Sequence, residues 1–336
     1  MSEIPATFPA FVVTRLDDGV ETGVRDFASD DLAPGEVDVR IDWSSINYKD
    51  ALATRFDGKV ARISPIIPGI DLAGEVIASR DPSVAVGQTV LAHGYDLGVA
   101  RHGGFGRYTR LPASFIVPLP AGLTARQAMA IGTAGFTAAM SVASLEARGL
   151  APGDGPVLVT GASGGVGSST VAILAKRGHE VWAATGKPEE GGRLRRLGAA
   201  GLIAREEVTA QSARPLDSAR WAGAVDTVGG ATLPYVLRTL RGGAAVASSG
   251  NASGPYLVTT VLPFILRGVA LLGMDSSAMP IDKRRALWAR LATDLRPNGL
   301  DEGEGLTEVT LETLPPALDM ILAGGARGRW VVRIAD

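Results

Sequence analysis

The sequence predicts an α/β protein built around a doubly wound parallel sheet, and two observations lead to this prediction. First, short apolar runs in the second half of the chain alternate with segments of helical periodicity, which is the pattern of parallel strands covered by helices. Second, a glycine-rich turn joins the first of these runs to a helix. Before about residue 131, predicted strands and turns predominate, so a second, mainly β part is expected.

The predicted parallel strands and helices follow one another in regular order. Helix 166–177 is followed by Gly178 and helix 193–197 by Gly198, as expected from the preference for glycine just past a helix end. The predicted strands are 157–160, 180–185, 202–204, 224–228, 244–248 and 269–273. Apolar runs of this length, bounded by turn residues, are typical of strands that are buried on both faces.

Elements outside this region are predicted from local alternation and amphipathicity. Strand 37–41 alternates between apolar and polar residues and follows a turn at Pro34-Gly35, and Thr124 is suited to begin a helix. The other predicted strands are 74–78, 86–92, 115–119 and 330–334, and the other predicted helices are 125–129, 135–147, 281–295 and 315–322.

The glycine-rich turn has the spacing of a dinucleotide-binding motif. Ala162-x-Gly164-x-x-Gly167 matches the pattern G-x-G-x-x-G, with alanine at the first position. A pyrophosphate can approach backbone N–H groups and the positive end of a helix dipole only where no Cβ intervenes. Because strand, turn, helix and second strand follow in the required order, we expect a dinucleotide site here rather than a tight turn without a ligand.

The composition of the 336-residue chain limits its function. Hydrophobic residues make up 46% and charged residues 20%, which is typical of a folded domain rather than a disordered chain. The net charge of −2 and the absence of a basic run predict no nucleic-acid partner. The chain contains no cysteine, so a disulfide framework, a thiolate nucleophile and a cysteine-ligated zinc ion are excluded.

Two stretches bear on localisation. Segment 1–13 lacks the charged start and apolar core of a signal peptide. The most apolar stretch, 257–273, is interrupted by Pro263 and Arg267 and is too short to span a bilayer. We therefore expect a cytoplasmic protein with no membrane partner.

The end of the second parallel strand predicts the type of dinucleotide. Sheets that bind NAD usually carry Asp or Glu there, which holds the ribose 2′-hydroxyl. In this chain the strand ends in Thr185, Gly186 and Lys187. A neutral end followed by a cation suits a 2′-phosphate, so the sequence favours NADPH; the alternative for Lys187 is a solvated surface lysine.

Several stretches, in order along nearly the whole chain, resemble the medium-chain dehydrogenase/reductase superfamily. Within it the chain is most similar to the zinc-free quinone-oxidoreductase branch, and there to the acrylyl-CoA reductases (NADPH), on the strength of Asn47-Tyr-Lys-Asp50 and Pro263-Phe-Ile-Leu-Arg267. The matching stretches are 43–52, 67–74, 130–138, 159–168, 221–229 and 262–267.

The resemblance implies a Rossmann doubly wound parallel sheet inserted into a mainly β (GroES-like) catalytic domain. Residues 1–130 and 276–336 would form the catalytic domain, and residues 131–275 would form the NADPH-binding domain. A homodimer is also implied, and strand 269–273 agrees with it, because an apolar edge strand is an aggregation hazard unless a second chain or a loop covers it.

The resemblance also implies which residues contact the cofactor. Arg205, just past the third parallel strand, is expected as a second cation near Lys187, with a surface arginine as the alternative. Arg329 is a further candidate for pyrophosphate or substrate, and Asp226 carries a family signature that is either structural or chemical. The residues expected to bind NADPH are Tyr48, Ser163, Gly164, Gly165, Val166, Thr185, Gly186, Lys187, Arg205, Asn251, Ile265 and Ser276.

No metal site is expected. Zinc-dependent members of the superfamily use Cys and His near the positions of 47–50 and 69–71, where this chain has neither. The three histidines His93, His102 and His179 are scattered, and each is interpreted as a surface or packing residue. Substrate activation must then come from hydrogen bonding and positioning.

Tyr48, Asn47 and Asp50 are the candidate catalytic residues. Tyr48 is expected to line the nicotinamide site, where it contacts the cofactor or donates a hydrogen bond; the alternative is a tyrosine that packs with a satisfied hydroxyl. Asn47 and Asp50 could equally cap a helix. Lys49 could be a solvated charge.

The leading functional hypothesis is NADPH-dependent reduction of the C=C bond of acrylyl-CoA to give propionyl-CoA. Reduction of a quinone is the alternative reaction, and a dinucleotide-binding protein without catalytic activity is the alternative from another class. A polar cluster at 47–50 favours an enzyme. For the phosphates of CoA, Arg55, Lys59, Arg62 and Arg101 are possible partners.

Overall fold

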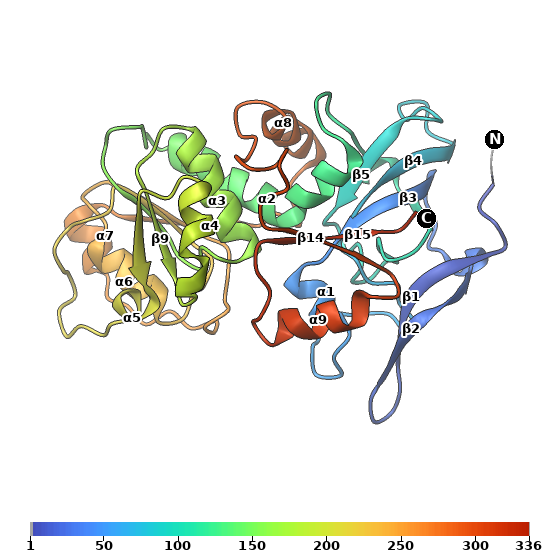
Figure 1. Ribbon diagram of the computed structural model, residues 1–336, viewed down its shortest axis with the longest axis horizontal. Coiled ribbons are helices and arrows are strands. Elements are labelled where there is room, and N and C mark those ends of the chain that lie inside the picture. Colours follow the sequence, from blue (N-terminus) through green and yellow to red (C-terminus); the bar gives the residue numbers. More distant parts are fainter. Residues whose placement is uncertain (1–2, 336) are drawn as a thin grey trace. The chain divides into compact units, whose positions relative to one another are not determined.

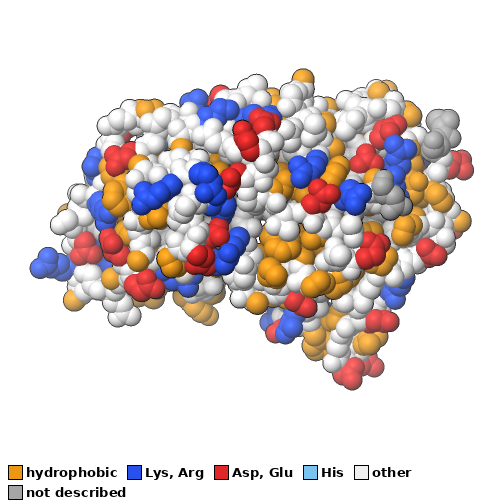
Figure 2. All heavy atoms as spheres, in the orientation of Figure 1, with side chains coloured by type: hydrophobic (Ala, Val, Ile, Leu, Met, Phe, Trp, Pro, Cys, Tyr) orange, Lys and Arg blue, Asp and Glu red, His pale blue; other side chains and the backbone are white. Residues whose placement is uncertain are grey.

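The computed structural model describes residues 3–335 and divides into two units. The first unit comprises Met1–Thr133, Ser277–Ala292 and Gly305–Asp336, and the second comprises Ala134–Ser276 and Thr293–Glu304. Each unit has its own sheet and its own buried core. Charged side chains of both signs are interspersed over the face drawn in Figure 2, in keeping with the small net charge.

The second unit contains the doubly wound parallel sheet (Figure 1). Its six strands are arranged in the order β10-β9-β8-β11-β12-β13, and neighbouring strands are parallel throughout. This is the 3-2-1-4-5-6 order of a Rossmann domain, so the predicted fold class is confirmed. The strands are β8 (Val157–Val159), β9 (Val181–Thr185), β10 (Gly201–Ala204), β11 (Gly223–Asp226), β12 (Ala245–Ser248) and β13 (Ala270–Gly273).

Alternate residues along the central strands pack on opposite faces of this sheet. Ala224 and Val246 belong to a cluster that includes Leu233 and Val236 of α6 (Thr232–Thr239), whereas Val225 and Ala247 belong to a cluster with Leu145. Both faces are therefore buried, which explains why the strands are continuously apolar. The other helices of the unit are α3 (Gly165–Lys176), α4 (Gly191–Arg196), α5 (Arg205–Val208) and α7 (Leu262–Arg267), with a 3-10 turn η3 (Pro188–Glu190).

The first unit is mainly β. Strands β14, β15, β3, β4, β5 and β7 lie in that order in one sheet, β6 pairs with β3, and β1 and β2 form a separate hairpin. The strands are β1 (Thr7–Arg15), β2 (Val20–Ala28), β3 (Val37–Ser45), β4 (Asp71–Ser79), β5 (Thr89–His93), β6 (Tyr108–Leu111), β7 (Val117–Pro118), β14 (Leu306–Thr310) and β15 (Arg329–Arg333).

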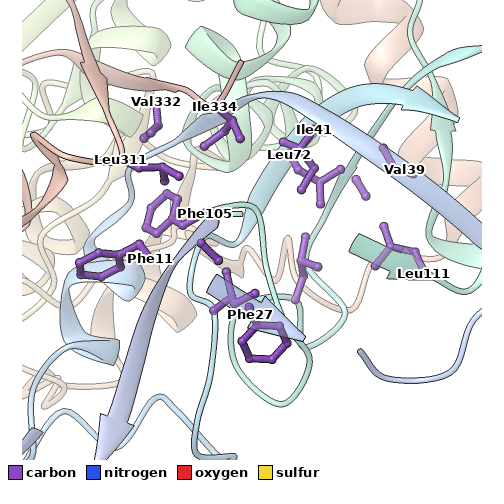
Figure 3. Close-up of a cluster of buried hydrophobic side chains, with 14 of the residues drawn as sticks. Phe11, Phe27, Val39, Ile41, Leu72, Phe105, Leu111, Leu311, Val332 and Ile334 are labelled. Carbon is purple, nitrogen blue, oxygen red and sulfur yellow. The ribbon is translucent and has the colours of Figure 1, made fainter. Parts of the chain in front are cut away.

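The core of the first unit draws on both ends of the chain (Figure 3). Phe11 and Phe27 of the hairpin, Ile41 and Leu72 of the sheet, and Val332 of the last strand belong to one buried cluster. The helical elements of this unit are η1 (Ser29–Asp31), α1 (Tyr48–Ala53), η2 (Ala113–Phe115), α8 (Ile281–Leu291) and α9 (Leu314–Leu322).

Helix α2 (Ala125–Glu146) is both long and apolar. By length and composition it could cross a membrane, but 83% of its most apolar window is buried inside the protein, so it is a core helix. Its backbone is not helical at Gly132, where φ is 51° and ψ is −164°. The two helices predicted for 125–129 and 135–147 are therefore the two halves of this kinked helix.

The structure differs from the expected domain assignment in the segment Thr293–Glu304. We expected it in the catalytic domain, but it belongs to the second unit. Side chains of that unit hold it: Lys176 donates to the carbonyl of Thr293 at 3.3 Å, and Arg196 pairs with Glu304 at 2.8 Å. The helix predicted for 281–295 accordingly ends earlier, at Leu291.

Candidate active site

Three polar residues meet where the ends of three neighbouring strands adjoin in the sheet of the first unit. Strand β3 runs antiparallel to both β4 and β15, so its end lies beside the beginnings of the other two strands. The residues at these positions are Ser45 at the end of β3, Asp71 at the start of β4 and Arg329 at the start of β15. All three are buried.

Asp71 is the centre of a hydrogen-bond network. Its Oδ2 accepts from Ser45 Oγ at 2.5 Å and from Asn47 Nδ2 at 2.8 Å, and both carboxylate oxygens accept from Thr133, whose Oγ1 donates to Oδ1 at 2.5 Å. Burial alone would raise the pKa of this carboxyl, but the neighbouring His93, the cation of Arg329 and the hydroxyl groups of Ser45 and Thr133 together hold the pKa below its ordinary value. Asp71 is therefore ionised near pH 7.

Arg329 joins this network to the kinked helix α2. Its Nε donates to the carbonyl of Ala130 at 2.9 Å, where the first half of the helix ends, and a cation at that end is favoured by the helix dipole. Its Nη2 donates to Ser45 Oγ at 2.9 Å and lies 3.9 Å from Asp71 Oδ2. A Cβ on Gly132 would overlap these three side chains, so the kink requires glycine. Arg329 is thus engaged within the unit rather than open to a ligand.

Asn47 and Asp50 have the capping roles that the sequence left open. Asp50, three residues after Asn47, accepts from the Asn47 backbone N–H with its Oδ2 at 2.8 Å, which is one half of a capping box. Its other oxygen accepts from the backbone N–H groups of Ile70 at 2.8 Å and Gly69 at 3.2 Å. The Asn47 amide is held between Asp71 Oδ2 and Arg329 Nη1, at 2.8 and 3.3 Å.

Asp50 is fully buried, which perturbs its titration. Burial and the negative charge of Asp71 raise the pKa of Asp50 to about 7, although the hydrogen bonds from Asn47 and Ile70 act in the opposite direction. A carboxyl group with no exposed surface does not reach a substrate. Asp50 is therefore a positioning residue that holds the beginning of α1.

Tyr48, the first residue of α1, has a different environment. It is 55% exposed, and among residues 3–335 none forms a hydrogen bond with its hydroxyl. The alternative of a packing tyrosine with a satisfied hydroxyl does not describe this side chain. The phenol is open to a ligand, while the helix start that carries it is fixed by Asn47 and Asp50. Lys49 beside it is exposed, as a solvated charge would be.

A buried histidine extends the network to α8. His93 pairs with Asp71 across β4 and β5, and its Nδ1 lies 3.3 Å from Thr133 Oγ1. The indole Nε1 of Trp288 donates to His93 Nε2 at 2.9 Å, and Nη1 of Arg284 lies 2.8 Å from His93 Nδ1. Burial and the adjacent Arg284 cation lower the pKa of His93 to about 3, although Asp71 acts in the opposite direction. His93 is therefore neutral near pH 7, and it is a packing residue, as predicted.

The glycine-rich turn in the second unit has the geometry of a phosphate-binding turn. Gly161 has a φ of +59°, and a Cβ there would overlap the side chain of Thr227. A Cβ on Gly167 would overlap the carbonyl of Gly161, so this glycine allows close packing of α3 on the turn. The positive end of α3 lies at Gly164, Gly165 and Val166.

The residues at the end of β9 lie beside this turn. Thr185 Oγ1 donates to Ser163 Oγ at 3.2 Å and accepts from the backbone N–H of Lys187 at 3.0 Å. Arg205 begins α5, directly after the strand that pairs with β9, and its guanidinium lies against Gly186, where a Cβ would overlap it. The two predicted cations are therefore near the same strand end.

The remaining predicted cofactor residues occupy different places. Asn251 and Ser276 follow the carboxyl ends of the neighbouring strands β12 and β13, on the side of the sheet where open α/β folds bind ligands. Ile265 lies instead on α7, where it is 68% exposed. The end of this helix is joined to the turn before β12, because the carbonyl of Arg267 accepts from the backbone N–H of Gly243 at 2.7 Å.

Asp226, at the end of β11, has a structural role. It is buried, and its carboxylate accepts from Thr160 Oγ1 at 2.6 Å and from the backbone N–H of Gly229 at 2.9 Å. Burial raises its pKa above the ordinary value. These contacts join the ends of two neighbouring strands, which accounts for the acidic residue in the motif.

Within residues 3–335, no group of three or more His, Cys, Asp or Glu side chains is arranged to hold a metal ion. His102 accepts from the backbone N–H of Ile67 at 3.2 Å, and His179 is buried.

Comparison with known proteins identifies the family. Residues 33–121 match the model of the alcohol dehydrogenase GroES-like domain. The chain is 46% identical to acrylyl-CoA reductase AcuI of Ruegeria pomeroyi, over 97% of this chain and 99% of that protein. The chain belongs to the medium-chain dehydrogenase/reductase superfamily. The chain is also 45% identical to YhfP of Bacillus subtilis, which is named as a quinone oxidoreductase, over 97% of this chain and 99% of that protein.

Solved structures of the superfamily agree with the fold of this member. The yhdH oxidoreductase of Salmonella enterica, solved in complex with NADP, superposes with a TM-score of 0.94 at 45% identity and covers 97% of this chain and 100% of its own. The yhfP protein of Bacillus subtilis, solved with NAD bound, gives a TM-score of 0.94 at 44% identity, over 98% and 99% of the two chains. Within the superfamily the chain groups with its quinone oxidoreductase-like and acrylyl-CoA reductase-like members, and it is an oxidoreductase.

Sequence reasoning named Arg329 as a ligand candidate but missed the network in which it lies. Asp71 and Arg329 each stand at the start of an apolar strand, and this placement of opposite charges was the available signal. The members that were missed are Asp71, Ser45, Thr133, Arg284 and Trp288.

Proposed function

We propose that this protein reduces the C=C bond of acrylyl-CoA, with NADPH as the electron donor, to give propionyl-CoA. The observation that carries the proposal is the exposed Tyr48 phenol on a firmly held helix start, in a chain 46% identical to an acrylyl-CoA reductase. The first unit is then the catalytic domain and the second the NADPH-binding domain. The reaction would take place in the cytoplasm.

The residues at the end of β9 fit NADPH. The Arg205 guanidinium lies against Gly186, in the space that a Cβ would fill, and Lys187 follows at the same strand end. A 2′-phosphate held there by a charge-assisted hydrogen bond gains about 1.5–3 kcal/mol, which is about tenfold to a hundredfold in affinity. Ser163, Gly164, Gly165 and Val166 would hold the pyrophosphate at the start of α3, and Asn251, Ile265 and Ser276 would contact the rest of the cofactor.

Tyr48 is the proposed hydrogen-bond donor in the reaction. When bound, NADPH supplies a hydride for Cβ of the acrylyl group. The electron pair of the C=C bond then moves toward the thioester carbonyl, where an enolate oxygen develops and Cα awaits a proton. The Tyr48 hydroxyl can donate to that oxygen or to the cofactor. Asn47 and Asp50 hold Tyr48 in place rather than touching the reacting atoms.

The protein is proposed to act as a homodimer. Strand β13 lies at the edge of the six-stranded sheet, and a run of exposed apolar side chains precedes and accompanies it. These side chains are Tyr256, Val258, Val261, Ile265, Leu266 and Leu271. Pairing of β13 with its copy across a two-fold axis would remove the edge and cover part of this apolar surface.

Quinone reduction is the second candidate, because YhfP carries that name. NADPH oxidation followed at 340 nm, first with acrylyl-CoA and then with a benzoquinone, separates the two. We expect a much higher kcat/KM with acrylyl-CoA and a lower Kd for NADPH than for NADH. Turnover of the quinone alone would overturn the proposed substrate, and turnover of neither would favour a binding protein without catalytic activity.

A further inference from the structure

A small pocket in the first unit is lined by four cationic side chains. Strands β1 and β2 form one wall, and the segment after α1 forms the other. The pocket has a volume of about 150 Å³, and its cations are Arg15, Arg55, Lys59 and Arg62. No acidic side chain lines it, and the rest of its wall is formed by small or apolar residues together with Ser64. We refer to it as the basic pocket.

The cations of the basic pocket are weakly neutralised. Arg55 lies 3.7 Å from Asp57 and Arg62 lies 3.3 Å from Asp96, in pairs that are largely exposed and so are easily exchanged for another anion. Arg15 donates to the carbonyl of Phe56, which leaves its charge uncompensated.

Lys59 is the most informative cation of the basic pocket. Among residues 3–335, none pairs with its ammonium group. Its φ of 54° lies in the left-handed region, which residues other than glycine rarely adopt. Strained backbone positions cluster at active sites and ligand-binding loops. The combination indicates a ligand with at least one negative charge.

The size and place of the basic pocket narrow the ligand further. Pockets that hold a whole small molecule measure about 300–1,000 Å³, so this pocket suits a single phosphate group. Helix α1 begins at Tyr48 and ends at Ala53, which lines the pocket. Six residues of helix span about 9 Å, so the anion would be well separated from the proposed reaction site.

We propose that the basic pocket binds a phosphate group in the nucleotide portion of the CoA substrate. This rests on the proposed function, because the reacting thioester must lie near Tyr48. An acyl-CoA carries its thioester and its phosphates at opposite ends of the flexible pantetheine arm, so one molecule can reach both a reaction site and an anion site on the same unit. A quinone has no phosphate and makes no use of such a pocket. Arg101, the fourth cation suggested for CoA, donates instead to the carbonyl of Pro34 at 2.8 Å and does not line the pocket.

Calorimetric titration of the full-length, NADPH-saturated protein tests the proposal. The probes are CoA, pantetheine, which lacks the phosphates, and inorganic phosphate. The variant is Arg55→Ala combined with Lys59→Ala, and the matched control is Lys283→Ala, which removes an exposed lysine of the same unit outside the pocket. We expect the Kd for CoA to rise about five- to thirtyfold in the double variant, with unchanged binding of pantetheine and with wild-type behaviour of the control.

Three results would overturn the proposal: equal affinity of wild type and double variant for CoA, wild-type binding of CoA no tighter than of pantetheine, or displacement of CoA by inorganic phosphate at a similar concentration. A separate outcome concerns the reaction. If wild type binds CoA through the pocket but does not reduce acrylyl-CoA, the pocket assignment is supported and the proposed function fails. If acrylyl-CoA is reduced with the same KM by the double variant, the function stands and the pocket assignment fails.

Discussion

Two residues only two positions apart, Tyr48 and Asp50, have opposite environments. The Asp50 carboxylate is fully buried and satisfied by backbone N–H groups, whereas the Tyr48 phenol is exposed and without a partner among residues 3–335. A side chain has to reach the substrate or cofactor to act on it. At the scale of single residues, we therefore propose that Tyr48 acts in the reaction and that Asn47 and Asp50 hold it in place.

Replacement of Tyr48 by Phe tests this division. Loss of one preorganised donor costs about 2.7–4 kcal/mol in a dry site and less in a hydrated one, so we expect kcat/KM with acrylyl-CoA to fall about tenfold to a thousandfold. The melting temperature should not change, because the hydroxyl has no protein partner to lose. Tyr256→Phe, at another exposed tyrosine, is the control for the kinetic measurement. Wild-type kinetics with a lower melting temperature would assign Tyr48 to the scaffold.

Asp50 and His93 give the stability of the protein two opposing dependences on pH. Folded Asp50 takes up its proton below about pH 7, whereas in the unfolded chain it does so near 3.9, so this group stabilises the fold as the pH falls from 7 toward 4. Folded His93 stays neutral down to about pH 3, whereas the unfolded imidazole protonates below about 6.5, so this group destabilises the fold as the pH falls.

Variants should separate the two contributions. In Asp50→Asn only the contribution of His93 remains. We expect lowering the pH from 7 to 5 to reduce the free energy of unfolding of this variant by about 2 kcal/mol relative to the change in wild type. In His93→Gln only the contribution of Asp50 remains, so the free energy of unfolding of this variant should rise as the pH falls from 7 to 5. Urea unfolding of all three proteins at both pH values provides the measurement. Parallel pH profiles would show that neither group has the perturbed pKa described above.

At the scale of elements, the kink of α2 is what lets Arg329 and Thr133 meet Asp71. Gly132 has a positive φ, and a Cβ there would meet the side chains of the network. We expect Gly132→Ala to cost about 2–5 kcal/mol, from the left-handed backbone and from overpacking. Gly122→Ala is the matched control: its φ is also positive, at 89°, but the space around its Cβ position is open.

The control variant should lose only about 1–2 kcal/mol, the cost of the left-handed conformation alone. Chemical denaturation of both variants and of wild type gives the comparison. Equal losses at the two glycines would mean that the network tolerates a methyl group, and the account of the kink would be wrong.

The elements differ in how far the sequence could predict them. The parallel sheet was predictable because its signals are local: the spacing Ala162-x-Gly164-x-x-Gly167, apolar runs of strand length and glycines after helices. The hairpin β1–β2 and strand β14 were not individually predicted, since their pairing depends on partners rather than on their own pattern.

The site shows the same contrast. The motif 47–50 marks the position of Tyr48, but the residues that fix it come from the ends of separate strands, from the kink in α2 and from α8. Their proximity follows from the antiparallel register of β15, β3 and β4, which no local pattern encodes. Burial likewise decides whether Asp50 caps a helix or acts on a substrate, and burial is a property of the folded chain.

At the scale of the whole molecule, the edge strand β13 and its apolar neighbours predict a dimer in solution. Light scattering at micromolar concentration should give twice the mass of one chain. Leu266→Glu introduces a charge on the exposed apolar run and should shift the population toward the monomer. Met320→Glu, at an exposed apolar residue of α9, should leave the mass unchanged. A wild-type monomer would contradict the proposed assembly.

The most direct test of the proposed reaction follows the hydride itself. Acrylyl-CoA is incubated in ordinary water with the enzyme and NADPH that carries deuterium at the transferred position of C4, and the product is analysed by mass spectrometry. We predict propionyl-CoA with one deuterium on Cβ and a solvent proton on Cα, formed in equal amount to the NADP produced. Deuterium on Cα, or NADPH oxidation without formation of propionyl-CoA, would contradict the account.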